Sequence, residues 1–327
     1  MSRPLCFVAR KEERLSRSTV SVVFAICFLV PLVLGLGGCG NGSQVLVDRA
    51  AEYHRAGKSD LAILELKKAL EENPNDYVAH NNLAQLYLQQ GQSDNALEQA
   101  RKAVELAPNR AVVQNTLGIV LDSRGDYDTA LEAYRKAVAL DPTYFVTYNN
   151  MATIYDVRDD YKDAEENYQK ALSLRPFHVE TLLNYGYLLH RLGRYQEAAQ
   201  LYRAIIERNP LHENAQVNLG ITLTALGELD KARQVLQGAL RLNPEGAKTH
   251  AALARIDADQ GQYEQALQEC ERALATTPNL VLALLNRGYV RQKTGQPHLA
   301  REDWVKVLEI DPKNTEAKKF LASLAAS

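Results

Sequence analysis

Eight prolines recur at intervals of 34 residues without a slip, and this period constrains the fold more than any other feature of the sequence. They are Pro74, Pro108, Pro142, Pro176, Pro210, Pro244, Pro278 and Pro312. A period near 34 is typical of a solenoid of helical hairpins, because one hairpin cannot bury its apolar face alone and must stack on its neighbours. The chain is therefore predicted to be an all-α array.

Three columns of small residues keep the same register as the prolines. The first is Gly57, Gly91, Gly125, Gly193, Gly227, Gly261 and Gly295, with Asp159 as its one exception. The second is Ala62, Ala96, Ala130, Ala164, Ala198, Ala232, Ala266 and Ala300. The third is Ala50, Ala84, Gly118, Ala152, Gly186, Gly220, Ala254 and Gly288.

Each column has a mechanical reason. The glycines predict the end of a first helix, because glycine adopts the left-handed conformation without penalty, and Asp159 is of a type that tolerates it. Small residues let two helix axes approach. A proline cannot continue a second helix and disfavours helical angles in the residue before it. Each unit is thus predicted to be helix, tight turn, helix and stop.

The columns resemble those of the tetratricopeptide repeat (TPR) family, with small residues at positions 8 and 27, Ala at 20, an aromatic at 24 and Pro at 32. The resemblance covers residues 43–314 as eight repeats. Position 24 holds Tyr134, Tyr168, Tyr202 and Trp304, and elsewhere Leu66, Ala100, Leu236 and Cys270. Ile205 and Val307 depart from the small residue at position 27. The resemblance implies a right-handed α-solenoid of eight helical hairpins.

Residues 315–327 follow the last repeat and are predicted to form a capping helix. Ala317, Phe320, Leu321 and Leu324 recur at helical spacing. Such an apolar stripe would cover the flank of the eighth repeat, which has no further repeat to pack against.

The N-terminal segment resembles a bacterial lipoprotein signal. Residues 1–17 carry five basic and two acidic side chains, and a largely apolar run follows over residues 20–36. The run ends in Leu36-Gly37-Gly38-Cys39, which resembles the lipobox, where the Cys sulfur receives a diacylglycerol before cleavage. The resemblance implies a signal peptide over residues 1–38, then a lipidated Cys39 and a short tether over residues 39–42.

An uncleaved membrane anchor is the alternative, because seventeen residues are just long enough to span a bilayer. Both interpretations tether the array to a membrane. The tether between Cys39 and a first helix expected near Gln44 reaches about 15 Å, which keeps the first repeat close to the headgroups. Gly40 rather than Asp follows the Cys, and by the sorting rules of lipoproteins this implies the outer membrane of the cell envelope, facing the periplasm.

Charge and motifs argue against several classes of function. Removal of residues 1–38 would leave 33 basic and 38 acidic side chains, a net charge of −5, with no basic run to suggest nucleic acid. The sequence has no Walker-type loop, paired-His zinc motif, Cys pair at metal spacing or nucleophile elbow. We therefore expect no enzyme activity, no cofactor, no metal and no small-molecule substrate.

The first helices of the repeats are expected to line a concave groove, whose most regular feature is a column of amides. Candidate peptide-binding residues at positions 5 and 6 are Asn82, Asn115, Asn149, Asn150, Asn184, Asn218 and Asn286. An Asn amide can bond both the N–H and the C=O of an extended peptide. Alternatively, the column ties helix to helix, and recognition then lies with Tyr187, Tyr289 and Arg255 on the same face.

Three functions are compatible with these features. The first is a membrane-anchored scaffold or adaptor of the cell envelope that binds extended segments of protein partners, resembling TPR lipoproteins that assist assembly of pilus secretins. The second is a targeting chaperone for a secreted or outer-membrane protein. The third is a non-catalytic module of a glycosyltransferase-like system, since similar arrays precede the catalytic part of O-GlcNAc transferases. The partner, the pathway and the oligomeric state stay open.

The lipobox generates the first testable prediction. Cys39→Ala removes the sulfur that would accept the diacylglycerol, so the precursor should accumulate unprocessed and without acyl label. Metabolic labelling with a fatty acid and comparison of protein mass measure both effects. Unchanged processing of the variant would contradict the lipoprotein interpretation.

Overall fold

A computed structural model describes residues 42–325, and in this range the chain forms 17 α-helices and no strands. The fold is therefore all-α, as predicted. The proposed signal peptide, Cys39 and most of the tether lie outside the described residues. Among residues 42–325, no helix has the length and apolar character needed to cross a bilayer.

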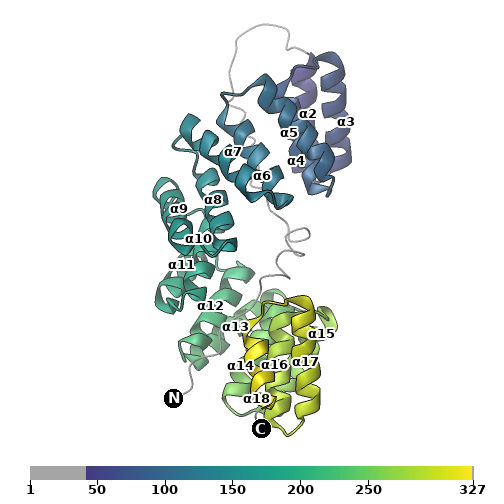
Figure 1. The fold of residues 1–327 in the computed structure, drawn as a ribbon. Coiled ribbons are helices and arrows are strands. Elements are labelled where there is room, and N and C mark those ends of the chain that lie inside the picture. The colour runs from purple at the N-terminus through teal and green to yellow at the C-terminus, as the bar shows by residue number, and fades with distance from the viewer. Residues whose placement is uncertain (1–41, 326–327) are drawn as a thin grey trace. The chain divides into compact units, whose positions relative to one another are not determined.

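The array divides into two compact units, which are the N-terminal unit (residues 42–176) and the C-terminal unit (residues 177–325). The N-terminal unit holds α2 (Gly42–Arg55), α3 (Ser59–Glu72), α4 (Tyr77–Gln89), α5 (Ser93–Leu106), α6 (Ala111–Ser123), α7 (Tyr127–Leu140), α8 (Phe145–Val157) and α9 (Tyr161–Leu174). The C-terminal unit holds α10 (Val179–Arg191), α11 (Tyr195–Arg208), α12 (Glu213–Ala225), α13 (Leu229–Leu242), α14 (Ala247–Asp259), α15 (Tyr263–Thr276), α16 (Val281–Lys293), α17 (Pro297–Ile310) and α18 (Thr315–Ala325). In each unit the helices lie side by side as successive pairs (Figure 1).

Each pair is one repeat, with a first helix (A helix) and a second helix (B helix) joined by the predicted tight turn. All seven column glycines have positive φ, from 72° at Gly57 to 82° at Gly125. Asp159 has φ 67° and is the only non-glycine residue with positive φ among the described residues. The register prediction is therefore confirmed at the level of single backbone angles. The first helix starts at Gly42, two residues earlier than expected.

The stop after the first B helix also joins two successive repeats. Asp76 caps α4, because its Oδ1 accepts from the backbone N–H of Val78 at 2.9 Å and of Ala79 at 3.2 Å. Its Oδ2 accepts from the Ser43 hydroxyl of the first repeat at 3.0 Å. One carboxylate thus satisfies helix-end donors and ties two repeats together.

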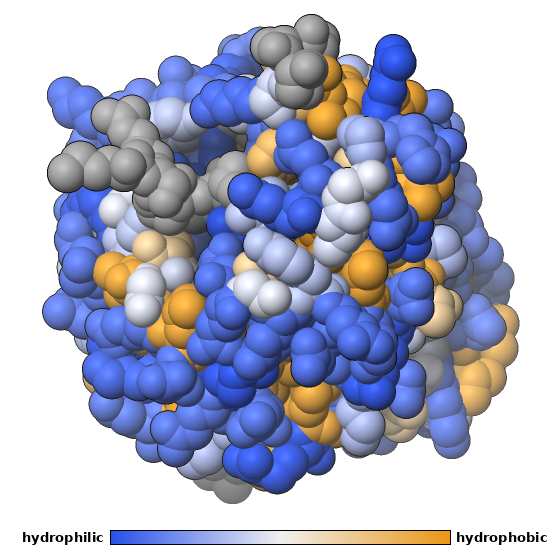
Figure 2. Space-filling model, turned by 90° about the horizontal axis from the view of Figure 1, so that it is seen from below, coloured by the Kyte–Doolittle hydropathy of each residue, from blue (hydrophilic) through white to orange (hydrophobic). Residues whose placement is uncertain are grey.

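The core follows the Ala column and position 24. All eight column alanines, from Ala62 to Ala300, are 0 % exposed. Tyr134, Tyr168, Tyr202 and Trp304 are among the largest fully buried side chains. On the face in Figure 2, hydrophilic residues predominate and hydrophobic ones occur in small groups, so the apolar columns mostly point inward.

Residues at positions 8 and 24 match in size within several repeats. Position 8 is glycine in the repeats of Tyr134, Tyr202, Leu236 and Trp304, and a Cβ added at Gly186 would lie 2.7 Å from the Tyr202 ring. A Cβ at Gly288 would overlap the Trp304 indole. Where position 24 is small, as at Cys270, position 8 is alanine, here Ala254. Ala152, in the repeat of Tyr168, departs from this pattern.

The predicted capping helix is α18, which packs on the last repeat. Its Phe320, Leu321 and Leu324 contact the apolar cluster of α16 and α17. The Phe320 ring stacks on Trp304, with centroids 4.6 Å apart and planes 16° apart. The eighth repeat therefore buries its flank against α18.

The size match predicts a specific coupling. Gly288→Ala should lower the free energy of unfolding by about 1–3 kcal/mol, because the new methyl group meets the rigid indole of Trp304. In a Trp304→Leu background, the same change recreates the Ala50 and Leu66 pair of the first repeat. Its cost there should fall by at least ~1 kcal/mol. A denaturant-based double-mutant cycle measures this difference, and equal costs in both backgrounds would refute the coupling.

Candidate functional site: the A-helix surfaces

The predicted site residues lie on the A helices, which contact one another in succession within each unit. In the N-terminal unit, α4 contacts α6 and α6 contacts α8. In the C-terminal unit, α10, α12, α14 and α16 form the corresponding series. We call these two series the A-helix surfaces and treat each unit by itself.

In the N-terminal unit, an amide of the predicted column ties neighbouring A helices. Asn115 on α6 is 3 % exposed, and its Oδ1 accepts from the Thr147 hydroxyl of α8 at 2.9 Å. The same oxygen accepts from Asn150 Nδ2 at 3.3 Å. Asn82 and Asn149 are buried as well, whereas Asn150 is only half-buried. The amide of Asn115 is thus occupied by contacts within the protein.

The C-terminal unit also has one buried amide of the column. Asn286 on α16 is 3 % exposed, and its Nδ2 donates to the Ala251 carbonyl of α14 at 2.8 Å. Asn184 on α10 and Asn218 on α12 are half-buried and stand at the same repeat position in consecutive repeats. One sequence column therefore holds both a buried helix tie and side chains that reach the surface. Sequence could not separate them, because residue type and spacing are identical.

Arg255 and Tyr289, both predicted from sequence, meet on the C-terminal unit. The Arg255 guanidinium of α14 lies 5.5 Å from the centre of the Tyr289 ring of α16. Lys293, one turn further along α16, lies 5.5 Å from the same centre. A ring between two cations is a cation–π arrangement. Sequence reasoning missed Lys293, although its spacing of four residues from Tyr289 places both on one helix face.

Tyr187 on α10 also has a cation near its ring. The Arg191 guanidinium lies 5.9 Å from the centre of its ring. Tyr187 is half-buried, in line with Asn184 on the same helix face. Tyr187, predicted as an alternative to the amide column, therefore lies on the same surface as the half-buried amide of Asn184.

A buried acid stands beside Arg255, and sequence reasoning also missed it. Glu316 on α18 is 7 % exposed, and burial raises the pKa of its carboxyl to about 7, against the opposing charges of Arg255 and Lys319. Arg255 itself bonds the Asp259 carboxylate through Nε at 3.0 Å. This end of the surface therefore carries a carboxyl group that titrates near neutral pH.

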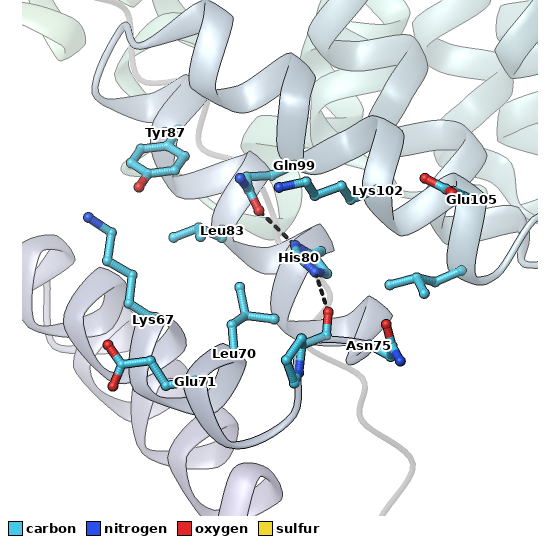
Figure 3. Close-up of a pocket in the computed structure, with 12 residues that line it drawn as sticks. Lys67, Leu70, Glu71, Asn75, His80, Leu83, Tyr87, Gln99, Lys102 and Glu105 are labelled. Carbon is cyan, nitrogen blue, oxygen red and sulfur yellow. Dashed lines mark hydrogen bonds between the residues drawn. The ribbon is translucent and has the colours of Figure 1, made fainter.

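A pocket of about 610 Å³ lies between α3, α4 and α5 (Figure 3). Its lining combines apolar Leu70 and Leu83 with a charged rim that includes Lys67 and Lys102. His80 points into it, but its Nδ1 is 2.7 Å from Gln99 Oε1 and its Nε2 is 3.0 Å from the Pro74 carbonyl. Both ring nitrogens are engaged by other groups of the protein, so His80 is a packing residue.

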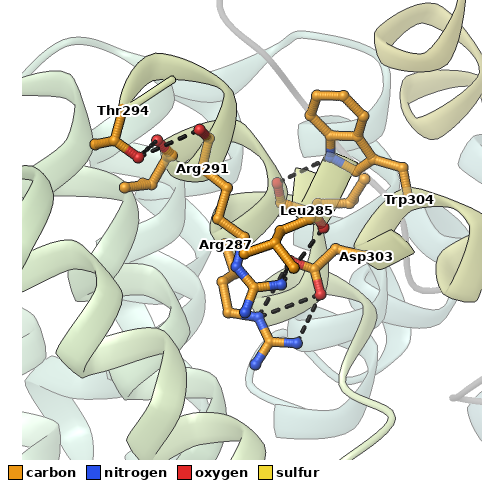
Figure 4. A network of polar contacts seen from close by, with 8 residues as sticks. Leu285, Arg287, Arg291, Thr294, Asp303 and Trp304 are labelled. Atoms are coloured by element: carbon orange, nitrogen blue, oxygen red, sulfur yellow. Dashed lines mark hydrogen bonds and ion pairs between the residues drawn. The ribbon is translucent and has the colours of Figure 1, made fainter. Parts of the chain in front are cut away.

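A buried ion network joins α16 to α17 (Figure 4). Asp303 is 3 % exposed and contacts Arg287 Nη2 at 2.6 Å and Arg291 Nη1 at 2.8 Å. Burial alone would lower the pKa of Arg287, but the bond to Asp303 outweighs it, and the pKa is raised. The first repeat has a related pair, Arg49 and Glu65, 3.1 Å apart. Because a buried charge is costly without a partner, these networks hold helix pairs together.

The described residues contain no cluster of three His, Cys, Asp or Glu side chains that could hold a metal ion. Cys270 is free and buried, and burial raises the pKa of its thiol to about 12. It behaves as the small core residue that its position predicts.

Comparison with known families agrees with the repeat assignment. Three family models, each described as tetratricopeptide repeat, match residues 76–143, residues 149–213, and residues 189–256 with 223–288. Together they cover more than half of the chain. The chain belongs to the tetratricopeptide repeat family, whose members are generally non-catalytic protein-interaction modules. No curated protein matches the chain.

Solved structures share the fold at low sequence identity. The APC/C hetero-tetramer Cut9–Hcn1 matches with TM-score 0.64 and 18% identity over 88% of this chain, which spans 57% of that chain. A tetratricopeptide repeat protein from Parabacteroides merdae ATCC 43184 matches with TM-score 0.56 and 17% identity, covering 80% of this chain and 99% of that one. PilW, a type IV pilus biogenesis factor, matches with TM-score 0.54 and 23% identity, covering 64% and 98%. These likenesses show the fold alone.

Glu316 generates a pH prediction. Its pKa is raised from 4.5 to about 7 in the folded protein, so its contribution to stability is fully present below pH 4.5 and is lost as pH rises through 7. Glu316→Gln removes this loss and should raise the free energy of unfolding at pH 8 by about 1–3 kcal/mol more than at pH 4.5.

Glu302 on α17 is exposed, so Glu302→Gln is the matched control for the loss of a carboxylate at the surface. Denaturant titrations at the two pH values measure the difference. A Glu316→Gln effect independent of pH would contradict the raised pKa.

Proposed function

We propose that this protein is a non-catalytic, lipid-anchored scaffold of the bacterial cell envelope that binds extended segments of protein partners on its A-helix surfaces. Membership of the tetratricopeptide repeat family supports the role in protein interaction. The lipobox at Cys39 supports the anchor. The proposed location, in the outer membrane and facing the periplasm, rests on Gly40, because it is Gly rather than Asp that follows Cys39.

The observation that carries the binding proposal is the pair Asn184 and Asn218. Both are half-buried at the surface, on consecutive A helices, at one repeat position. An amide offers a donor and an acceptor together, as a peptide backbone does, so two amides in series can hold an extended segment with little demand on its side chains. Tyr187 adds apolar contact area on the same surface.

The cluster of Arg255, Tyr289 and Lys293 supports recognition of side chains as well. Two cations beside one ring favour a carboxylate or an aromatic group of the partner. Backbone binding at Asn184 and Asn218 and side-chain selection at Tyr289 would divide affinity and specificity between the two ends of the C-terminal unit.

A targeting chaperone for a secreted or outer-membrane protein is the second candidate. It uses the same surfaces, but it releases its client, whereas a scaffold that assists assembly of a secretion or pilus complex co-purifies with stable partners. Affinity purification of the full chain from its native envelope, with and without a brief crosslinking step, separates the two.

The proposed surface predicts the effect of a double substitution. Asn184→Ala with Asn218→Ala should weaken binding by about 5- to 100-fold, because each lost hydrogen bond contributes about 0.5–1.5 kcal/mol. Peptides selected from a random library on the wild-type protein serve as probes, and calorimetry measures the affinity. The melting temperature should hold, since Ala is the better helix former.

Asn286→Ala is the matched control. It removes the helix tie to Ala251, so it should lower the melting temperature while leaving peptide affinity nearly unchanged. Unchanged peptide affinity of the double variant would contradict the proposal that these amides bind the peptide backbone. A collapse of its melting temperature would show that Asn184 and Asn218 are helix ties too.

A further inference from the structure

The first repeat exposes leucines on its B helix. Leu61 and Leu64 on α3 are 41 % and 47 % exposed, and their spacing of three residues places them on one side of the helix. Val45 on α2 is 49 % exposed. We call these three residues the first-repeat flank.

The corresponding residues of the other repeats are mostly polar. Position 22, which holds Leu64, is Glu98, Glu132, Glu166, Gln200, Gln234, Gln268 and Glu302 in the other seven repeats. Position 19, which holds Leu61, is Asn95, Thr129, Asp163, Glu197, Lys231, Gln265 and Leu299. The repeat fold thus does not require leucine at either position, and the departure belongs to the first repeat.

Val45 lies on the side where an inner repeat meets the repeat before it. Position 3, which holds Val45, is 0 % exposed at Ala79, Val113 and Thr147, and the Thr147 hydroxyl bonds Asn115 of the preceding repeat. Within the described residues, no repeat precedes α2 and α3. Leu61 and Leu64 lie instead on an outer face of the B helix, because positions 19 and 22 are exposed in the inner repeats too, as at Asn95 and Glu98.

Charged groups around the leucines suit a lipid headgroup region. Lys58 precedes Leu61 and Lys68 follows Leu64 in the chain, and both lysines are exposed. Glu65 is buried and balanced by Lys68 at 2.8 Å and Arg49 at 3.1 Å. The Asp60 carboxylate accepts from Gln90 of α4 at 2.7 Å. Apolar side chains flanked by lysines match an interfacial helix, whose leucines enter the acyl boundary while the lysines reach the phosphates.

The chain before α2 indicates which surface meets the flank. Cys39 precedes the start of α2 by three residues, and the apolar run ends at residue 36. In both forms of the proposed tether, with the run cleaved at a lipidated Cys39 or retained as an anchor, the chain enters α2 from the bilayer.

We propose that Leu61 and Leu64 of the first-repeat flank lie on the lipid bilayer, in the interfacial region, with the axis of α3 parallel to the membrane. This inference rests on the proposed membrane tether. The contact fixes how the first repeat stands on the membrane, which a flexible tether alone would not do.

Fluorescence quenching by brominated lipids tests the contact. The full chain is made in a Gram-negative host and reconstituted into vesicles with bromine on the acyl chains. Leu64→Trp reports on the flank, and Glu132→Trp, at the same position of the third repeat, is the matched control. Trp304 is the one native tryptophan and is 0 % exposed, so it contributes the same background to both.

We expect the brominated vesicles to quench Leu64→Trp and to leave Glu132→Trp unchanged. Flotation of each variant with the vesicles is measured first. A chain that floats without quenching at residue 64 overturns the flank contact and leaves the anchor intact. Equal quenching at residues 64 and 132 overturns the proposed orientation. A chain that does not float overturns both the contact and the anchor.

Discussion

A hairpin of two short helices cannot bury its apolar face alone, and every other feature of this protein depends on how the hairpins stack. The A and B helices approach closely because position 20 is alanine, a small residue, in all eight repeats. Each of these alanines is 0 % exposed. Bulky residues at position 24, such as Trp304, are then accommodated by glycine opposite, such as Gly288. Stability is consequently distributed over similar interfaces between neighbours. Surface positions of the A helices remain available for recognition.

The same stacking gives polar side chains two roles, as ties between helices and as groups at the surface, and one side chain can have both, as the half-buried Asn150 does when it donates to Asn115. Asn115 and Asn286 are buried and bond the neighbouring A helix, while Asn184 and Asn218 reach the surface. Asp303 pairs with two arginines between α16 and α17. A rigid scaffold needs both roles, because surface groups present a fixed pattern to a partner only when the helices beneath them are fixed.

The sequence predicted the fold almost completely, and the reason is repetition. Asp159 illustrates this, since its place in a glycine column alone predicted the positive φ that the structure shows. The cap was predictable because Phe320 continues the apolar spacing beyond the last proline. Repeated columns report what every unit must do, so they specify shared geometry well.

The site was predicted less well, because recognition depends on where repeats differ. Residue type could not distinguish the buried amide of Asn286 from the half-buried amide of Asn218. No sequence pattern indicated that Glu316 is buried, since its burial and raised pKa come from the packing of α18 beside Arg255. Lys293 could have been found from its helical spacing to Tyr289. The predicted roles at Cys39 and in the signal segment lie outside the described residues and stay predictions.

Photo-crosslinking in the native envelope tests the central claim, that partners bind on the A-helix surface. A photoreactive phenylalanine replaces Tyr187 on α10 in one variant and the exposed Gln200 on α11, a B helix of the same repeat, in the other. Our account predicts discrete protein adducts from position 187 and none from position 200, with the partner identified by mass spectrometry. Adducts confined to position 200, or equal adducts from both positions, would contradict it.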